Sequence, residues 1–140
     1  ANSVRRTTAP EEDFYDQVSA STAKLLADRG VMVSIGAHGQ EEGLASHWEM
    51  WSFARGGMSP LEALRTATIT PARHLGFAQD IGSLEPGKLA DLVILNANPL
   101  DDIQNSDDIS HVMLNGRLYN AMTLNEEVTG DRRRAPYWWE

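Results

Sequence analysis

A short polar loop holds most of the side chains in this sequence that are suited to chemistry. It follows the apolar run 31–35 and carries His38, Gln40, Glu42 and His47. An imidazole can bind a metal or move a proton near neutral pH, and polar side chains beside it can bind a substrate. We therefore take this loop as the candidate site, with His38 at its centre. A solvated connection between two elements is the alternative interpretation.

The elements on either side of the loop would position it. The run 31–35 is rich in β-branched residues, which predicts a strand buried on both faces, and Gly36 ends it. A helix is expected over 47–55, and Ser46 and Glu49 have the spacing of a capping box at its start. In α/β folds, ligands bind in such loops at the carboxyl ends of strands.

Helical signals surround this strand and loop. Phe14, Val18 and Leu25 recur at helical spacing and predict an amphipathic helix over 12–29, which Gly30 ends. The order helix, strand, loop, helix is typical of an α/β fold.

A second pair of helical signals follows. Ser59 and Glu62 form another capping box, with Pro60 at the first helical position, so a helix should begin there. A further short helical turn is expected within 70–76.

The character of the sequence changes after residue 76, because β signals replace helical ones. Strands are expected at 81–84 and 91–95, and Pro86-Gly87 predicts a type II turn between them. Asn115-Gly116 lies between two short apolar runs, which is a strong hairpin signal. The sequence therefore predicts an α-β-α part over 1–76, a β part over 77–120 and a tail over 121–140.

Composition excludes some classes of partner and site. The net charge of −8 disfavours nucleic acid and anionic lipid as partners. The absence of cysteine excludes disulfides and thiolate metal sites. No apolar run approaches the ~18 residues of a membrane span. We expect a soluble protein, cytoplasmic or periplasmic, with no membrane and no nucleic-acid partner.

Several blocks together resemble the C-terminal part of the amidohydrolase superfamily, on the imidazolonepropionase and prolidase-like side. The most specific block is 81–95, with the sequence IGSLEPGKLADLVIL, followed by Asn98-Pro99. The blocks 57–68 and 112–119 lie beside it in the family's order and spacing. Together these blocks carry the resemblance across roughly residues 30–120.

The resemblance implies a fold and a chemistry. Residues 1–76 would be the last part of a (β/α)₈ barrel, and residues 77–120 would be strands of a small composite β-sandwich domain. The family hydrolyses amide-type or related bonds with one or two divalent metals, commonly zinc, which activate a bound water. A small-molecule or peptide-like substrate is implied.

Two departures from the family pattern concern the metal. The family's His-x-His and most of its other ligands have no counterpart here, so the chain looks like the last quarter to third of an enzyme. The family's usual Asp after the eighth strand is also absent, and His38 stands nearest that place. His38 is therefore the candidate catalytic residue and metal ligand, and Gln40, Glu42 and His47 are candidates for binding substrate.

Three hypotheses follow for the chain. It is the C-terminal portion of a metal-dependent amidohydrolase acting on C–N bonds, with zinc or another divalent metal in the complete enzyme and not necessarily in this chain. Alternatively it belongs to a catalytically inactive or altered member, or it is a non-enzymatic binding or assembly module. We expect it to associate with copies of itself or with a missing N-terminal part of the same protein.

Overall fold

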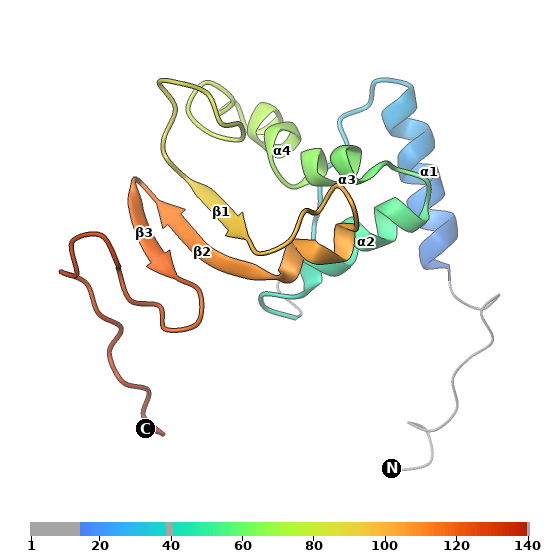
Figure 1. The fold of residues 1–140 in the computed structure, drawn as a ribbon. Helices are drawn as coiled ribbons and strands as arrows, with labels where there is room; N and C mark the ends of the chain where they lie inside the picture. The colour runs from blue at the N-terminus through green and yellow to red at the C-terminus, as the bar shows by residue number, and fades with distance from the viewer. Residues whose placement is uncertain (1–14, 39–40, 140) are drawn as a thin grey trace, which may run out of the picture.

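Helices come first along the chain and a small sheet comes last. The computed structural model describes residues 15–38 and 41–139. The helical half consists of α1 (Asp16–Asp28), α2 (Ala45–Arg55), α3 (Pro60–Thr66) and α4 (Ile69–His74). The second half consists of β1 (Leu92–Leu95), the 3₁₀ helix η3 (Ile103–Asp107), β2 (Ile109–Leu114) and β3 (Arg117–Asn120). Figure 1 shows the sheet beside the helices, with η3 against α2.

Helix α1 packs on α2 through its small residues. Ala20 is 2% exposed, and a Cβ added at Gly56 would lie 2.4 Å from the Ala20 carbonyl carbon. The large apolar residues expected to face the core lie outside instead, because Val18 is 61% and Leu25 50% exposed. The helix over 12–29 is thus confirmed within 16–28, but its predicted packing face is wrong for these two residues.

The core is small and lies among the helices and η3. Its buried members are Ala20, Met50, Phe53, Met58, Ala63 and Ile103. Val33 and Ile35 are partly buried and pack against this cluster. The core therefore joins both halves of the chain through a single residue of η3.

The predicted strand over 31–35 is wrong for this structure. Residues 31–37 have no strand assignment. Val31 N donates to Leu26 O, and Ile35 N donates to Thr66 O at 3.0 Å. A strand requires a neighbouring strand, and the described part of the chain supplies none beside this segment.

The second capping box is confirmed and starts α3. The Glu62 carboxylate accepts from the Ser59 N–H at 2.7 Å, and the Ser59 Oγ accepts from the Glu62 N–H at 3.3 Å. Pro60 is the first residue of the helix, as expected. Helix α4 begins at Ile69, one residue before the helical turn that the sequence predicts within 70–76.

The sheet is a three-stranded antiparallel meander in the order β1-β2-β3. Val93 pairs with Val112, and Val112 pairs with Tyr119 on the other side. The predicted hairpin is confirmed, since Asn115 has φ 49° and Gly116 has φ 76° between β2 and β3.

The segment before β1 only partly agrees with expectation. Residues 81–84 form bends and coil, so the strand predicted there is wrong. The turn over 85–88 is confirmed, because Lys88 N donates to Glu85 O at 3.2 Å and Gly87 has φ 95°.

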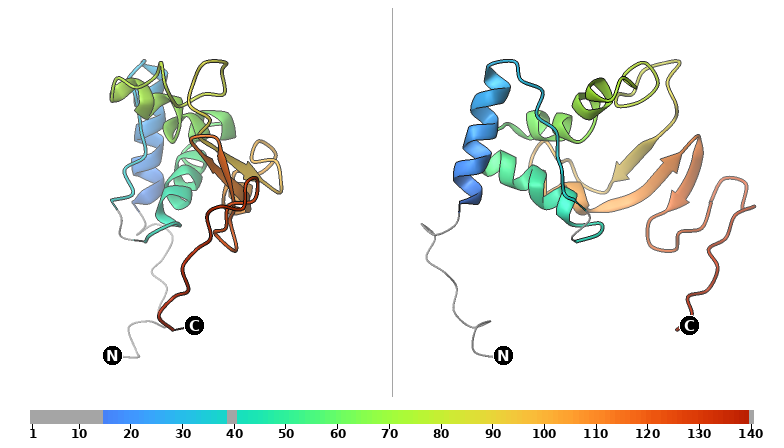
Figure 2. Two further views of the ribbon diagram at one scale, coloured as in Figure 1. Left: turned by 90° about the vertical axis from the view of Figure 1, so that its left-hand side faces the viewer. Right: turned by 180° about the vertical axis from the view of Figure 1, so that it is seen from behind.

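The last described residues leave the sheet as a turn-rich tail, which Figure 2 shows from two further sides. Tyr119 and Glu126 form an isolated antiparallel bridge, and beyond it the described chain has no helix or strand. None of the described helices is both long and apolar enough to cross a membrane. The mixture of helices and strands agrees with the α/β class, while the three-part division of the chain stays a prediction.

Candidate functional site

The loop after residue 35 is attached to helix α2 by Glu49. Its Oε2 accepts a hydrogen bond from the backbone N–H of Gly36 at 2.7 Å. The capping box expected from Ser46 and Glu49 is wrong, because α2 starts at Ala45 and no side chain caps its first turn. Glu49 therefore holds the start of the candidate loop.

His38 lies two residues beyond this attachment. It has φ 57°, in the left-handed region that histidine visits more often than most residues. The residue is exposed, and within the described chain its ring makes no hydrogen bond or ion pair. The loop thus presents an imidazole that is open to a ligand.

Two of the predicted substrate-binding residues, Glu42 and His47, lie among the described residues, and no hydrogen bond or ion pair joins either of them to His38. Glu42 is exposed in the turn before α2, and Gln40 lies outside the described residues. His47 turns to η3, where its Nδ1 lies 3.1 Å from the Ser106 Oγ. The gathering of these side chains into one site therefore stays a prediction.

Ser106 is the centre of a polar cluster that the sequence did not predict. It is 4% exposed and accepts a hydrogen bond from the Trp51 Nε1–H at 3.0 Å. Trp51 Nε1–H also points at the Ile103 carbonyl oxygen, at 3.0 Å. These contacts fix η3 to α2, and with it His47. No local signal marks them, because Trp51 and Ser106 are separated by 55 residues.

The tryptophans of α2 differ in environment. Trp51 is half-buried with its N–H hydrogen-bonded, and Phe53 is 9% exposed. Trp48, by contrast, is 46% exposed.

The other two histidines lie elsewhere. His74 is exposed in the last turn of α4. His111 lies on β2, where its Nε2 is 3.0 Å from a Glu127 carboxylate oxygen. Residues 15–38 and 41–139 contain no group of three His, Cys, Asp or Glu side chains able to hold a metal. A metal bound at His38 would therefore need further ligands from outside this described set.

The carboxylates with shifted pKa values lie outside the candidate loop. Hydrogen bonds from the Ser59 backbone and hydroxyl hold the pKa of Glu62 below its ordinary value. Hydrogen bonds from Ser83 and Lys88 lower the pKa of Glu85, and Thr129 does the same for Glu126. All three perturbations follow from capping or turn contacts, so none of them marks a catalytic acid.

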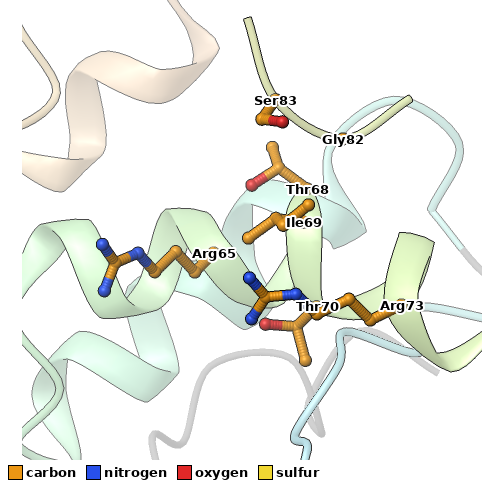
Figure 3. Close-up of a pocket in the computed structure, with 7 residues that line it drawn as sticks. All are labelled: Arg65, Thr68, Ile69, Thr70, Arg73, Gly82 and Ser83. Atoms are coloured by element: carbon orange, nitrogen blue, oxygen red, sulfur yellow. The ribbon is translucent and has the colours of Figure 1, made fainter. Parts of the chain in front are cut away.

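A hollow of about 490 Å³ lies away from this loop, between α3, α4 and the bend before β1 (Figure 3). The residues that line it are Arg65, Thr68, Ile69, Thr70, Arg73, Gly82 and Ser83. None of them belongs to the loop of His38.

Comparison with known proteins gives one consistent family. The model of the amidohydrolase family matches residues 9–119. An imidazolonepropionase from Geobacillus kaustophilus is 38% identical over 91 residues, covering 62% of this chain and 22% of that protein. An ochratoxinase from Aspergillus niger is 33% identical over 112 residues, covering 77% of this chain and 23% of that protein.

Solved structures of proteins similar to this chain support the same family assignment. The crystal structure of a Xaa-Pro dipeptidase with methionine bound in its active site superposes with a TM-score of 0.66 at 30% identity. The match covers 73% of this chain and 25% of the dipeptidase. The chain thus spans about a quarter of the length of these relatives. The family model covers most of the chain, and sequence and structure both match hydrolases of this type, so the chain belongs to the amidohydrolase family.

Proposed function

We propose that this chain is the C-terminal portion of a metal-dependent amidohydrolase that hydrolyses C–N bonds. A bound divalent metal would activate the attacking water in the complete enzyme, and zinc is the first candidate for this metal. The observation that carries the proposal is the exposed His38, presented by a loop that Glu49 attaches to α2, in a chain of this family. The bond would be that of an amide, a cyclic amide or a dipeptide.

The described residues do not form a metal site by themselves. We therefore assign most metal ligands to a part of the protein outside this chain, which would also complete the (β/α)₈ barrel beside 31–35. Residues 77–120 would belong to the small composite sandwich domain, and this missing part or a second copy would be the chain's partner. The exposed Val31 and Met32 support this assignment, since they are 49% and 47% exposed on a segment without a neighbouring strand.

We assign His38 two alternative tasks, binding the metal or moving a proton. Its exposed ring has both nitrogens available within the described chain, and an imidazole nitrogen can bind a metal or accept a proton. An imidazole does not reproduce the charge of the family's usual Asp. Glu42 and Gln40 remain candidates for polar groups of the substrate. His47, held by Ser106, is a weaker candidate because one of its ring nitrogens is already engaged.

The test is an assay of the full-length protein that contains this chain. Purified enzyme would be loaded with zinc, manganese or cobalt and offered X-Pro dipeptides and cyclic amides. The first choice of dipeptides follows the Xaa-Pro dipeptidase that the chain resembles. We expect His38→Ala to lower kcat/KM about 100-fold or more, the size of a lost proton-transfer group. The matched control, His74→Ala, removes an exposed histidine on α4 and should leave kcat/KM unchanged.

Metal analysis separates this proposal from its rivals. The 140-residue chain alone, measured by plasma mass spectrometry, should hold less than one metal per chain. A stoichiometric metal lost in His38→Ala would contradict the assignment of the other ligands to a missing part. Full-length protein that holds no metal and turns over none of these substrates would favour the inactive or binding-module hypothesis instead.

A further inference from the structure

Two arginines from consecutive helices line the same hollow without an ion pair. Arg65 comes from α3 and Arg73 from α4, and the side chain of Arg73 runs from its helix toward Thr70 and Arg65 (Figure 3). Both residues are exposed. Within the described residues, neither guanidinium has a carboxylate within 4 Å, whereas Arg55 pairs with Asp16. The hollow therefore has an excess of positive charge at its wall.

Two carboxylates near this hollow, Glu85 and Glu62, already have other partners. Glu85 accepts hydrogen bonds from Ser83 and Lys88, and the charge of Arg73 makes only a minor contribution to lowering its pKa. Glu62, which lines an adjoining hollow with both arginines, accepts from Ser59 and pairs with Lys24. The arginines are thus left to meet an anion from outside.

The hydroxyl groups that line the hollow differ in whether they already make a hydrogen bond within the protein. The Thr68 Oγ1–H donates to the Leu64 carbonyl oxygen at 2.8 Å, and Ser83 is committed to Glu85. The Thr70 hydroxyl makes no hydrogen bond within the described chain. It can therefore donate to an oxyanion held between Arg65 and Arg73.

An adjoining hollow of about 250 Å³ extends the site with apolar surface. It shares Arg65, Thr70 and Arg73 with the first hollow. Its lining also includes Val31–Val33 and Met58. A ligand held at the arginines would therefore meet apolar side chains on one side.

We propose that this site binds a small organic anion, with its carboxylate or phosphate group at Arg65 and Arg73 and its apolar part toward Val31–Val33. Guanidinium groups bind oxyanions with charge-assisted hydrogen bonds, and the combined volume suits a small molecule. The site is separate from the loop of His38. It is proposed for the 140-residue chain itself, because Val31 and Met32 also belong to the face that we assign above to the missing part of the barrel.

The experiment follows the side-chain Nε–Hε signals of arginine by nuclear magnetic resonance in the 140-residue chain at low ionic strength. The probes are inorganic phosphate, acetate and hexanoate. We expect saturable shifts of the Arg65 and Arg73 signals, with hexanoate binding several-fold more tightly than acetate because its tail reaches the apolar side. Arg65→Gln and Arg73→Gln should each weaken binding roughly tenfold.

The matched control is Arg29→Gln, which removes an exposed arginine that has no ion pair in the described chain and does not line either hollow. It should leave the affinities unchanged, and circular dichroism should show that all three variants keep the fold. Shifts that never saturate, or affinities equal in all variants, would overturn the proposal. Shifts of the same signals that depend on protein concentration rather than added anion would also overturn it, because a carboxylate of a second copy would then occupy the site.

Discussion

Glu49 accepts a hydrogen bond from the backbone N–H of Gly36 at 2.7 Å, across 13 residues of chain. This contact joins the end of the extended segment 31–35 to helix α2. His38 lies just beyond it, and the loop then returns to the start of α2. The same glutamate thus fixes both the entry of the candidate loop and the helix that follows it.

Glu49→Ala should release this entry point. Loss of an acceptor for a backbone N–H costs about 1 kcal/mol of stability at a partly exposed site. Hydrogen exchange should show the Gly36 amide exchanging faster in Glu49→Ala than in the parent chain. Glu49→Gln keeps an acceptor oxygen and should restore most of the protection. Equal exchange in all three proteins would mean that the bond does not hold the loop.

Gly56→Ala should destabilise the contact between α1 and α2. An added Cβ would lie 2.4–2.6 Å from Ala20 and Ser21, mostly from backbone atoms, so one helix must shift. Overpacking of this kind costs about 1–3 kcal/mol, which urea unfolding would measure. Gly36→Ala is the matched control, because a Cβ there meets nothing within 4 Å. An unfolding midpoint equal to that of the control would show that the helices are further apart than described.

Trp51→Phe should loosen η3 from α2. The substitution removes the N–H that the Ile103 carbonyl and the Ser106 hydroxyl accept, at an expected cost of about 1–2 kcal/mol. Trp48→Phe is the control, since that indole is 46% exposed and makes no hydrogen bond within the described chain. Urea unfolding followed by far-ultraviolet circular dichroism compares the two. Equal losses in both variants would contradict a specific role for the Trp51 N–H.

Features with a local signal could be predicted from the sequence. The capping box of Ser59 and Glu62 is set by a spacing of three residues, and the hairpin at Asn115-Gly116 is set by the left-handed φ values of its two central residues. Each is determined by neighbours in the chain, so the surrounding fold does not need to be known.

Features that depend on distant partners could not be predicted in this way. Glu49 has the right spacing to cap α2, but a backbone N–H from the preceding segment offers it another donor. The apolar run 31–35 has strand propensity and still forms no strand, because pairing requires a second strand. The contact of Trp51 with Ser106 joins residues far apart in sequence, and nothing in either local pattern indicates it.

The capping box also predicts a dependence of stability on pH. Hydrogen bonds from Ser59 hold the pKa of Glu62 below its ordinary value, so the unfolded chain binds this proton more readily than the folded one. The stabilisation that the ionised Glu62 carboxylate gives is complete above the pKa of Glu62 in the unfolded chain. It is lost as the pH falls through the lower pKa of Glu62 in the folded chain. Glu62→Gln keeps a capping oxygen but not the charge, so it should be less stable than the parent at pH 6 and approach it as the pH falls below the folded pKa of Glu62. Urea midpoints across this range measure the difference, with Glu41→Gln, an exposed loop glutamate, as control. A difference that stays constant with pH would show that the charge of Glu62 contributes nothing to the cap.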